Sequence, residues 1–292
     1  MNLFQGLKAK VKTKIPLSRY TTFKIGGEAD FFIEPTDVRE LRKILKIAKR
    51  NNLRIYILGA GSNLLVSDEG VRAVVIRLSS DYFKKIKFLG NYVWVGAGLK
   101  VSRLLKSCLE NGLGGIEFLT GIPATLGGAI FMNAGTKEGC IGDFVEEVKV
   151  MDYNGKIKKL KRNSLDFGYR YSNLKNFIIL EALLRLIKKD KKEIRNKMDY
   201  FMNYRRLTQE LSYPSCGCIF KNPNGFFAGK LIEDCNLKGK SIGDAQVSQK
   251  HANFIINRNS ASAKDVLKLI DYIKGKVKKK FNIDLELEIE IW

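Results

Sequence analysis

The chain has 292 residues, 45% of them hydrophobic, and carries a formal net charge of +22 at pH 7. This length allows two or more domains with apolar cores of their own, and the composition is that of a globular protein. No apolar run approaches the roughly 20 residues needed to span a bilayer, so we expect no membrane partner. The first residues lack the apolar core of a signal peptide, which predicts a cytoplasmic protein.

The positive charge is spread along the chain. Lysine and arginine recur at 8–14, 39–54, 188–206 and 274–280, mostly on the polar faces of expected helices. A nucleic-acid-binding protein remains the alternative, but such proteins gather their cations on one face. We therefore expect no nucleic-acid partner, and a basic surface suits a small polyanionic ligand such as a nucleotide.

The chain has five cysteines and a single histidine, which limits the metal sites and redox chemistry that it can support. An odd cysteine count without a secretory signal predicts reduced thiols. Cys216 and Cys218 are separated by one residue, which is too close for the usual Cys-x-x-Cys zinc or redox arrangement. We expect no metal site.

Strands and helices alternate along the chain with recognisable boundaries. A helix begins after Thr36 or Asp37 and ends near Asn51, and another begins at Ser262 with Asp265 completing a capping box. Further helices are expected at 101–109, 189–206 and 228–236. The expected strands are 23–25, 29–33, 54–58, 73–76, 84–89, 92–95, 145–152, 156–160, 177–187, 253–257 and 284–292.

A glycine loop follows the expected strand 54–58. Its sequence is Gly59-Ala-Gly-Ser-Asn-Leu-Leu-Val66. Two glycines leave backbone N–H groups exposed in a concave nest, which typically binds a phosphate. The next residues are apolar and do not start a long helix, unlike the usual dinucleotide fingerprint. A plain tight turn is the alternative.

A second glycine-rich segment runs from Gly112 to Gly135 and contains seven glycines in 24 residues. Glycine at this density among bulky apolar residues is typical of backbone pressed against a flat ligand or another backbone. A tightly packed helix–strand junction explains the composition equally well.

Four segments together resemble one family. They are Gly59–Val66, Gly121-Ile-Pro-Ala-Thr-Leu-Gly-Gly128 with Met132-Asn-Ala-Gly135, Phe167-Gly-Tyr-Arg-Tyr-Ser172, and Gly217-Cys-Ile-Phe-Lys-Asn-Pro223. In this order they resemble the UDP-N-acetylenolpyruvoylglucosamine reductase family, over about residues 22–288. The short spacing between the third and fourth segments resembles its compact type II subclass.

The resemblance implies an α+β fold with bound FAD. Two subdomains of the vanillyl-alcohol-oxidase (PCMH) type, at 1–75 and 76–188, would bind FAD, and an α/β domain at 200–292 would bind substrate. The final strand, 284–292, would bring Glu288 to the active site. FAD would be non-covalent, because the glycine loop lacks a flavin-linking His or Cys. The implied FAD contacts are Gly59, Ala60, Gly61, Ser62, Asn63, Gly121, Ile122, Pro123, Gly128 and Asn133.

The resemblance also implies a reaction. NADPH would reduce FAD, and hydride would then pass to the enolpyruvyl group of a UDP-sugar to give UDP-N-acetylmuramate. Arg170 would stabilise the developing enolate, since a guanidinium fork meets both oxygens of a carboxylate. Glu288 would assist it, although residues alone do not separate Glu288 from Glu286 and Glu290. Cys218 stands where many relatives carry a proton-donating serine, and a packing role is the alternative.

Tyr169, Asn222 and His251 fall at substrate-contact positions of the family, although a lone histidine is usually structural. We expect a monomer whose substrate is a nucleotide-sugar. Two positions depart from the family pattern: Lys137 replaces a frequent tyrosine, and Thr208 replaces a frequent substrate-binding lysine. Lys137, Arg205 and Arg206 are candidates to replace that lysine.

Overall fold

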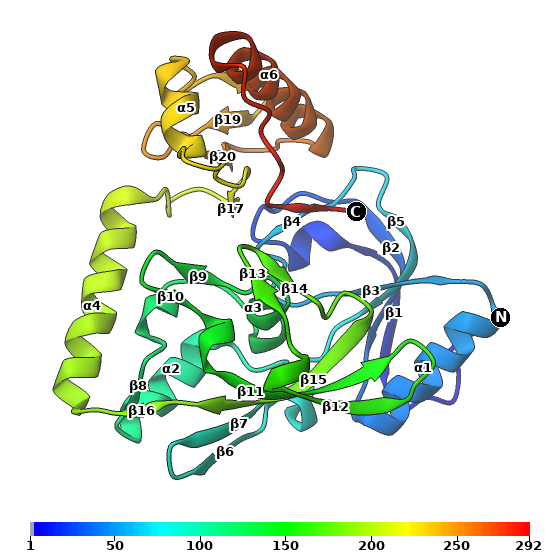
Figure 1. Cartoon of the computed structure of the whole chain (residues 1–292). Helices are drawn as coiled ribbons and strands as arrows, with labels where there is room; N and C mark the ends of the chain where they lie inside the picture. Colours follow the sequence, from blue (N-terminus) through cyan, green and yellow to red (C-terminus); the bar gives the residue numbers. More distant parts are fainter. Residues whose placement is uncertain (1–2) are drawn as a thin grey trace. The chain divides into compact units, whose positions relative to one another are not determined.

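The computed structural model describes residues 3–292, and the chain passes back and forth between two structural units (Figure 1). Unit 1 contains residues up to 13 together with 31–60 and 72–203. Unit 2 contains 14–30, 61–71 and 204–292. Each unit therefore combines segments that are far apart in sequence. The predicted domain boundaries at 75, 188 and 200 stay a prediction.

The first sheet has four strands in the order β1-β2-β5-β3. Strands β3 and β5 are parallel, with Arg54 opposite Ala73. Helix α1, which lies between β2 and β3 in the chain, begins after Asp37, whose carboxylate accepts the backbone N–H groups of Arg39 and Glu40. The elements are β1 (Lys10–Pro16), β2 (Glu28–Glu34), α1 (Val38–Arg50), β3 (Arg54–Ile57) and β5 (Val71–Ile76).

The second sheet, in unit 1, has five strands in the order β12-β11-β15-β7-β6, and all its pairs are antiparallel. Two tight turns fix the register: Gly90-Asn91 joins β6 to β7, and Tyr153-Asn-Gly155 lies between β11 and β12. Both predicted hairpins are confirmed. The strands are β6 (Ile86–Leu89), β7 (Tyr92–Gly96), β11 (Val145–Asp152), β12 (Ile157–Lys161) and β15 (Phe177–Arg185).

Short elements complete unit 1. The helices are α2 (Val101–Glu110), the six-residue α3 (Leu126–Phe131) and α4 (Lys191–Thr208), whose last residues belong to unit 2. Two-residue ladders pair β8 (Leu113–Gly114) with β16 (Ile187–Lys188), β9 (Gly135–Thr136) with β10 (Gly139–Cys140), and β13 (Phe167–Gly168) with β14 (Tyr171–Ser172). Turns of 3₁₀-helix occur at Leu17–Tyr20 in unit 2, and at Asp81–Lys84, Glu117–Leu119, Ile141–Phe144 and Arg162–Ser164.

Unit 2 is built on a four-stranded antiparallel sheet in the order β17-β20-β19-β18. Ser262 caps α6 through a capping box with Asp265, as predicted. The elements are β17 (Ser215–Cys218), α5 (Ala228–Asp234), β18 (Ser241–Ile242), β19 (Ala245–Val247), β20 (Phe254–Asn257) and α6 (Ala263–Phe281).

Each unit has its own apolar core. In unit 1 the residues of both sheets share one cluster, to which Leu41, Val95 and Val148 belong. The core of unit 2 takes Phe23, Ile25 and Leu65 from the first third of the chain and packs them with residues of α5 and α6. The two cores explain why each unit combines segments that are far apart in sequence.

The predicted strand 284–292 is regular only at its end, in β21 (Glu290–Ile291). There it pairs in parallel with β4 (Leu64–Leu65). Before β21 the segment makes one isolated bridge, between Leu287 and Phe220. None of the helices within residues 3–292 combines the length and the apolar sequence that a membrane span requires.

Candidate functional site

The glycine loop 59–63 presents a run of backbone donors. Within residues 3–292, no acceptor is recorded for the backbone N–H of any of these five residues. Gly61 has φ +64°, and a Cβ there would lie 2.2 Å from the backbone oxygen of Tyr20. The loop is therefore closely packed on one side while its N–H groups remain available, which is the arrangement of an anion-binding nest.

The two predicted glycine-rich segments meet at Gly59. A Cβ on Gly59 would lie 2.9 Å from Thr125 Oγ1. The same hydroxyl accepts the backbone N–H of Gly128 at 3.3 Å and caps α3. Sequence reasoning did not single out Thr125, although a threonine directly before a glycine-rich helix start is a capping signal. Gly121, with φ +80°, lies in a turn closed by the bond from Ile122 N–H to Leu119 O at 3.0 Å, and Pro123 follows in the segment that leads to Thr125.

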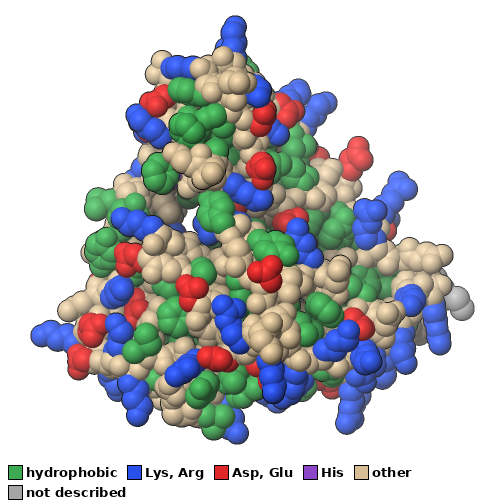
Figure 2. All heavy atoms as spheres, in the orientation of Figure 1, with side chains coloured by type: hydrophobic (Ala, Val, Ile, Leu, Met, Phe, Trp, Pro, Cys, Tyr) green, Lys and Arg blue, Asp and Glu red, His purple; other side chains and the backbone are tan. Residues whose placement is uncertain are grey.

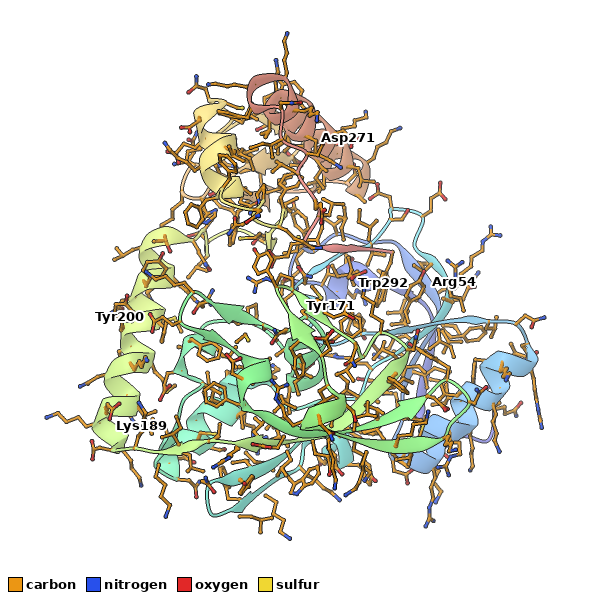
Figure 3. All side chains as sticks on the ribbon, viewed as in Figure 1. Arg54, Tyr171, Lys189, Tyr200, Asp271 and Trp292 are labelled. Atoms are coloured by element: carbon orange, nitrogen blue, oxygen red, sulfur yellow. The ribbon has the colours of Figure 1, made fainter. Side chains whose placement is uncertain are left out.

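Arg170 lies in the two-residue turn between β13 and β14. Both strands are labelled in Figure 1. Its φ is +54°, a left-handed conformation in which an L-residue is uncommon. The guanidinium stacks on the ring of Tyr169, 5.2 Å from its centroid, and Nη1 donates to Gly135 O at 3.4 Å. Tyr169 is 54% exposed, and Tyr171, labelled in Figure 3, is 40% exposed. A cation and two aromatic rings are thus presented at one turn.

Asn133 connects this turn to the second glycine-rich segment. Its side chain is 4% exposed. Nδ2 donates to Gly168 O at 2.9 Å, and Oδ1 accepts the backbone N–H of Gly142 at 2.9 Å. Ser172 Oγ donates to Phe131 O at 2.7 Å from the other strand of the hairpin. Sequence reasoning predicted Asn133 only as an FAD contact and did not single out Ser172.

In unit 2, Cys218 follows a left-handed glycine at a register shift. Gly217 has φ +82°, and the pairing of β17 with β20 shifts between Ser215 and Cys218. The next residues are fixed by Asn253, 3% exposed, which accepts from Phe220 N at 3.0 Å and donates to Phe220 O at 2.8 Å. A bulge held by a buried amide therefore sets the direction in which Cys218 leaves the strand.

The neighbouring Cys216 is chemically different from Cys218. It is fully buried, and burial raises the pKa of its thiol far above the ordinary value. A fully buried thiol has no access to a substrate, and buried structural cysteines are chemically inert. Cys218 is partly exposed. The structure thus separates an inert cysteine from an accessible one.

The three glutamates of the last segment are also separated. Glu286 is 77% exposed in its side chain and pairs with Lys221 at 3.4 Å, and Glu290 is exposed. Glu288 is half-buried. Its backbone N–H donates to Ile219 O at 2.8 Å, and its carbonyl accepts Asn63 Nδ2 at 2.9 Å. Glu288 therefore lies beside the residue that follows Cys218 and beside the last residue of the glycine loop.

The predicted substrate contacts of unit 2 lie at the start of α5. Asn222 is exposed, and its Oδ1 accepts the backbone N–H of Ala228 at 3.0 Å. His251 Nδ1 accepts the backbone N–H of Asn253 at 3.2 Å, so its neutral form carries the proton on Nε2. Burial lowers the pKa of His251 from its ordinary value of 6.5. His251 therefore offers a neutral N–H donor at pH 7.

The two departures from the family pattern have different surroundings. Thr208 Oγ1 donates to Tyr204 O at 2.8 Å at the end of α4, so its hydroxyl is used within the helix. Lys137 is exposed in the turn between β9 and β10, next to Glu138, which pairs with Lys197 of α4 at 3.6 Å. Arg205 donates to Gln209 Oε1 at 3.1 Å.

A cavity of about 490 Å³ lies between α2 and α4 in unit 1. It contains none of the predicted site residues. Every charged side chain that lines it is exposed, and the lining residues are Lys106, Leu109, Glu110, Lys191, Lys192 and Arg195. In Figure 2, lysine and arginine side chains are scattered over the visible face among carboxylates. No separate cationic site follows from either observation.

The donors of the glycine loop and its contact with the second glycine-rich segment indicate a cofactor that carries phosphate. Residues 29–161 match the protein-family model described as "FAD binding domain". Residues 209–292 match the model described as "UDP-N-acetylenolpyruvoylglucosamine reductase, C-terminal domain". The fold and the site therefore define a flavin-dependent oxidoreductase, and the predicted α+β architecture with an FAD-binding part and a C-terminal domain of this type is confirmed.

Similarity extends over the whole chain. The chain is 44% identical to UDP-N-acetylenolpyruvoylglucosamine reductase of Moorella thermoacetica, over 98% of this chain and 95% of the relative, and 45% identical to that of Clostridium novyi, over 97% and 92%. The crystal structure of UDP-N-acetylenolpyruvylglucosamine reductase (MurB) from Thermus caldophilus matches with a TM-score of 0.84, 38% identity and coverage of 97% and 99%. The chain belongs to the UDP-N-acetylenolpyruvoylglucosamine reductase family.

Proposed function

We propose that this protein uses NADPH to reduce the enolpyruvyl group of UDP-N-acetylglucosamine-enolpyruvate, giving UDP-N-acetylmuramate for peptidoglycan synthesis. The observation that carries the proposal is the glycine loop, where five consecutive backbone N–H groups have no recorded acceptor within residues 3–292. A diphosphate is the anion that such a loop suits, and FAD contains one. Family membership supplies the substrate.

The residues present fit FAD. Gly59 and Gly61 have no room for a Cβ, so the loop backbone is held in place before any ligand binds. When bound, FAD would supply the redox chemistry, which is transfer of hydride from NADPH to the enolpyruvyl carbon distal to the carboxylate. The proposed FAD contacts are the loop 59–63 together with Gly121, Ile122, Pro123, Gly128 and Asn133.

Arg170 is the proposed electrophile. Addition of hydride to the distal carbon leaves negative charge on the carbon next to the carboxylate, delocalised as an enolate. A guanidinium meets two oxygens with parallel N–H donors and stays charged at any physiological pH. The turn presents this group beside an exposed tyrosine ring, and backbone strain of this kind is concentrated at functional positions.

Glu288 is the proposed second group at the enolate. Its half-buried side chain sets it apart from its two exposed neighbours of the same type. The hydrogen bond from Asn63 to its carbonyl ties its backbone to the glycine loop. In the proposed role, Glu288 hydrogen-bonds the enol oxygen.

Cys218 is the proposed proton donor. The proton from its Sγ goes to the carbon next to the carboxylate, and together with the hydride it completes addition across the double bond. A thiol is a stronger acid than a hydroxyl near neutral pH, so it can donate a proton from the same place as a serine. Its partial exposure and the inertness of Cys216 support this assignment.

Tyr169, Asn222 and His251 are the proposed substrate contacts. His251 is the only histidine, and its lowered pKa keeps it neutral, which suits hydrogen bonding better than charge pairing. We also propose a monomer with FAD-binding subdomains at 1–75 and 76–188 and a substrate domain at 200–292.

The proposal is tested by the spectrum of the purified protein and by its NADPH consumption. A yellow protein with flavin absorption is expected, and acid denaturation should release the flavin into the supernatant. NADPH consumption should rise on addition of UDP-N-acetylglucosamine-enolpyruvate. UDP-N-acetylglucosamine, which lacks the enolpyruvyl group, is the matched control. Equal rates with both sugars, or a protein without flavin, would overturn the proposal.

A further inference from the structure

We infer that Asn133 is a positioning residue, which fixes the Arg170 turn on the second glycine-rich segment. The inference rests on the proposed role of Arg170 and assigns the side chain of Asn133 a function apart from contact with FAD. All the residues concerned belong to unit 1.

The Arg170 hairpin is too short to be rigid alone. Its ladder contains two residue pairs, Phe167 with Ser172 and Gly168 with Tyr171. An isolated two-stranded hairpin is at best marginally stable in water. The turn also places Arg170 in a left-handed conformation, which is unfavourable for an L-residue. Contacts outside the hairpin must therefore hold it.

The structure provides three such contacts with residues 131–135. Asn133 Nδ2 bonds to Gly168 O at 2.9 Å, Ser172 Oγ to Phe131 O at 2.7 Å, and Arg170 Nη1 to Gly135 O at 3.4 Å. Asn133 and Ser172 are buried and their hydrogen bonds are short, whereas the hydrogen bond of Arg170 is long. Asn133 bonds to the residue directly before the turn, so it controls the entry of the chain into the turn.

Asparagine is suited to this position for three reasons. Its amide offers one donor and one acceptor, and it meets a carbonyl and an N–H whose identities fix the orientation of the amide. Its own φ is +44°, which asparagine tolerates better than most residues. The space is also closed, because a Cβ on Gly142 would lie 2.8 Å from Asn133 Oδ1 and 2.6 Å from Phe167 Cγ.

The position of Arg170 relative to the reacting atoms should affect the rate of the reaction. A displacement of about 1 Å in a group that contacts the reacting atoms costs on the order of 10²-fold in rate. Asn133→Gly keeps the left-handed backbone and removes both hydrogen bonds. We expect substrate-dependent reoxidation of the reduced protein, compared at matched flavin content, to slow by about 10- to 100-fold.

Asn52→Gly is the matched control. Asn52 also lies in unit 1 and has a left-handed backbone conformation, with φ +51°. It is exposed, however, and follows the C-terminal end of α1. The same substitution there should leave both half-reactions unchanged. A second measurement is independent of activity: amide hydrogen exchange at 167–172 should be faster in Asn133→Gly than in the wild type, and unchanged in Asn52→Gly.

A double-mutant cycle with Arg170→Lys completes the test. If Asn133 acts through Arg170, Asn133→Gly should slow reoxidation less than 3-fold once Arg170 is replaced. Fully additive effects would overturn the inference, as would wild-type reoxidation in Asn133→Gly. If Arg170→Lys itself reoxidises at the wild-type rate, the proposed role of Arg170 fails instead, so the two failures are distinguishable.

Discussion

Two segments of this protein are each held by a buried asparagine, but they differ in which residue has the left-handed backbone conformation. In unit 1, buried Asn133 holds the turn that presents Arg170; in unit 2, buried Asn253 holds the segment that follows Cys218. Each asparagine satisfies one backbone N–H and one backbone C=O. In unit 1 the left-handed residue is Arg170 itself, whereas in unit 2 it is Gly217, one residue before the thiol.

This difference in backbone conformation determines what holds Cys218 and Arg170 in position. A Cβ on Gly217 would meet nothing within 4 Å, so glycine is needed there for its backbone angle and not for space. Cys218 therefore keeps an ordinary backbone. Arg170 has no such glycine beside it, and its place depends on contacts that outweigh its own strain. We therefore expect the position of Arg170 to depend more on its neighbours than the position of Cys218 does.

Losses of rate of two or more orders of magnitude are expected at both functional residues, and the first variant is Arg170→Lys. Lysine keeps the charge but loses the planar fork that meets two oxygens. Reoxidation of the reduced protein by UDP-N-acetylglucosamine-enolpyruvate should slow by about 10²–10³-fold, which is the loss typical of one donor at a developing oxyanion. Flavin reduction by NADPH should survive. Stopped-flow absorbance separates the two steps, and wild-type rates in both would exclude Arg170 from the site.

The next effect concerns Cys218. Cys218→Ala removes the acidic proton, so reoxidation by substrate should fall by about 10²–10⁴-fold, as for a lost general acid. Cys218→Ser supplies a hydroxyl from the same place and should keep substantial activity. Reoxidation is compared at matched flavin content.

A packing role for Cys218 makes a different prediction. Alanine and serine would then both be tolerated, or both would lower stability and flavin content together. Reoxidation of Cys218→Ala within a few-fold of the wild type would show that the proton comes from elsewhere.

Asn253→Ala tests the support of the turn in unit 2. It leaves the N–H and C=O of Phe220 buried without their side-chain partner, which costs about 1–3 kcal/mol for each group. The free energy of unfolding, measured by urea denaturation with FAD present, should fall by roughly 2–4 kcal/mol. Asn224→Ala, at an exposed position of the same unit, is the control. A loss below about 0.5 kcal/mol would mean that Asn253 does not hold the turn.

The smallest effect is a pH dependence from His251. Burial lowers its pKa in the folded protein, so the unfolded chain binds the proton more readily. The stability contributed by neutral His251 is present above pH 6.5 and is lost as the pH falls through 6.5 toward the lower folded pKa. His251→Asn keeps an acceptor near Nδ1 and cannot titrate. Urea denaturation at pH 7.5 and 5.5 should show a smaller decline for this variant than for the wild type.

Local signals predicted the local structure of both units. Asp37, one of the two residues expected to cap the first helix, and Ser262 are the observed caps, and two predicted hairpins form at Gly90-Asn91 and Tyr153-Asn-Gly155. Such features depend on neighbours within a few residues, so they can be read from a single sequence. The predicted last strand was only partly right, because its first residues make a single bridge.

The support of the site could not be predicted in this way. Asn133 and Asn253 act on residues 35 and 33 positions away, and nothing near them in sequence marks those bonds. The same holds for the glutamates of the last segment, which are equivalent by pattern. Only tertiary burial separates Glu288 from Glu286 and Glu290, and the family resemblance selected the same residue.

The interleaving of the chain has a consequence for its synthesis. Asn63 bonds to Glu288, which lies 225 residues later, and Phe23 accepts a hydrogen bond from Asn257 of the same unit. On the ribosome, the early segments of unit 2 emerge long before their partners, with Phe23 and Leu65 still uncovered. Unit 2 can therefore assemble only after nearly the whole chain has emerged, and nascent chains that stall before Glu288 should depend on chaperones that shield these apolar residues.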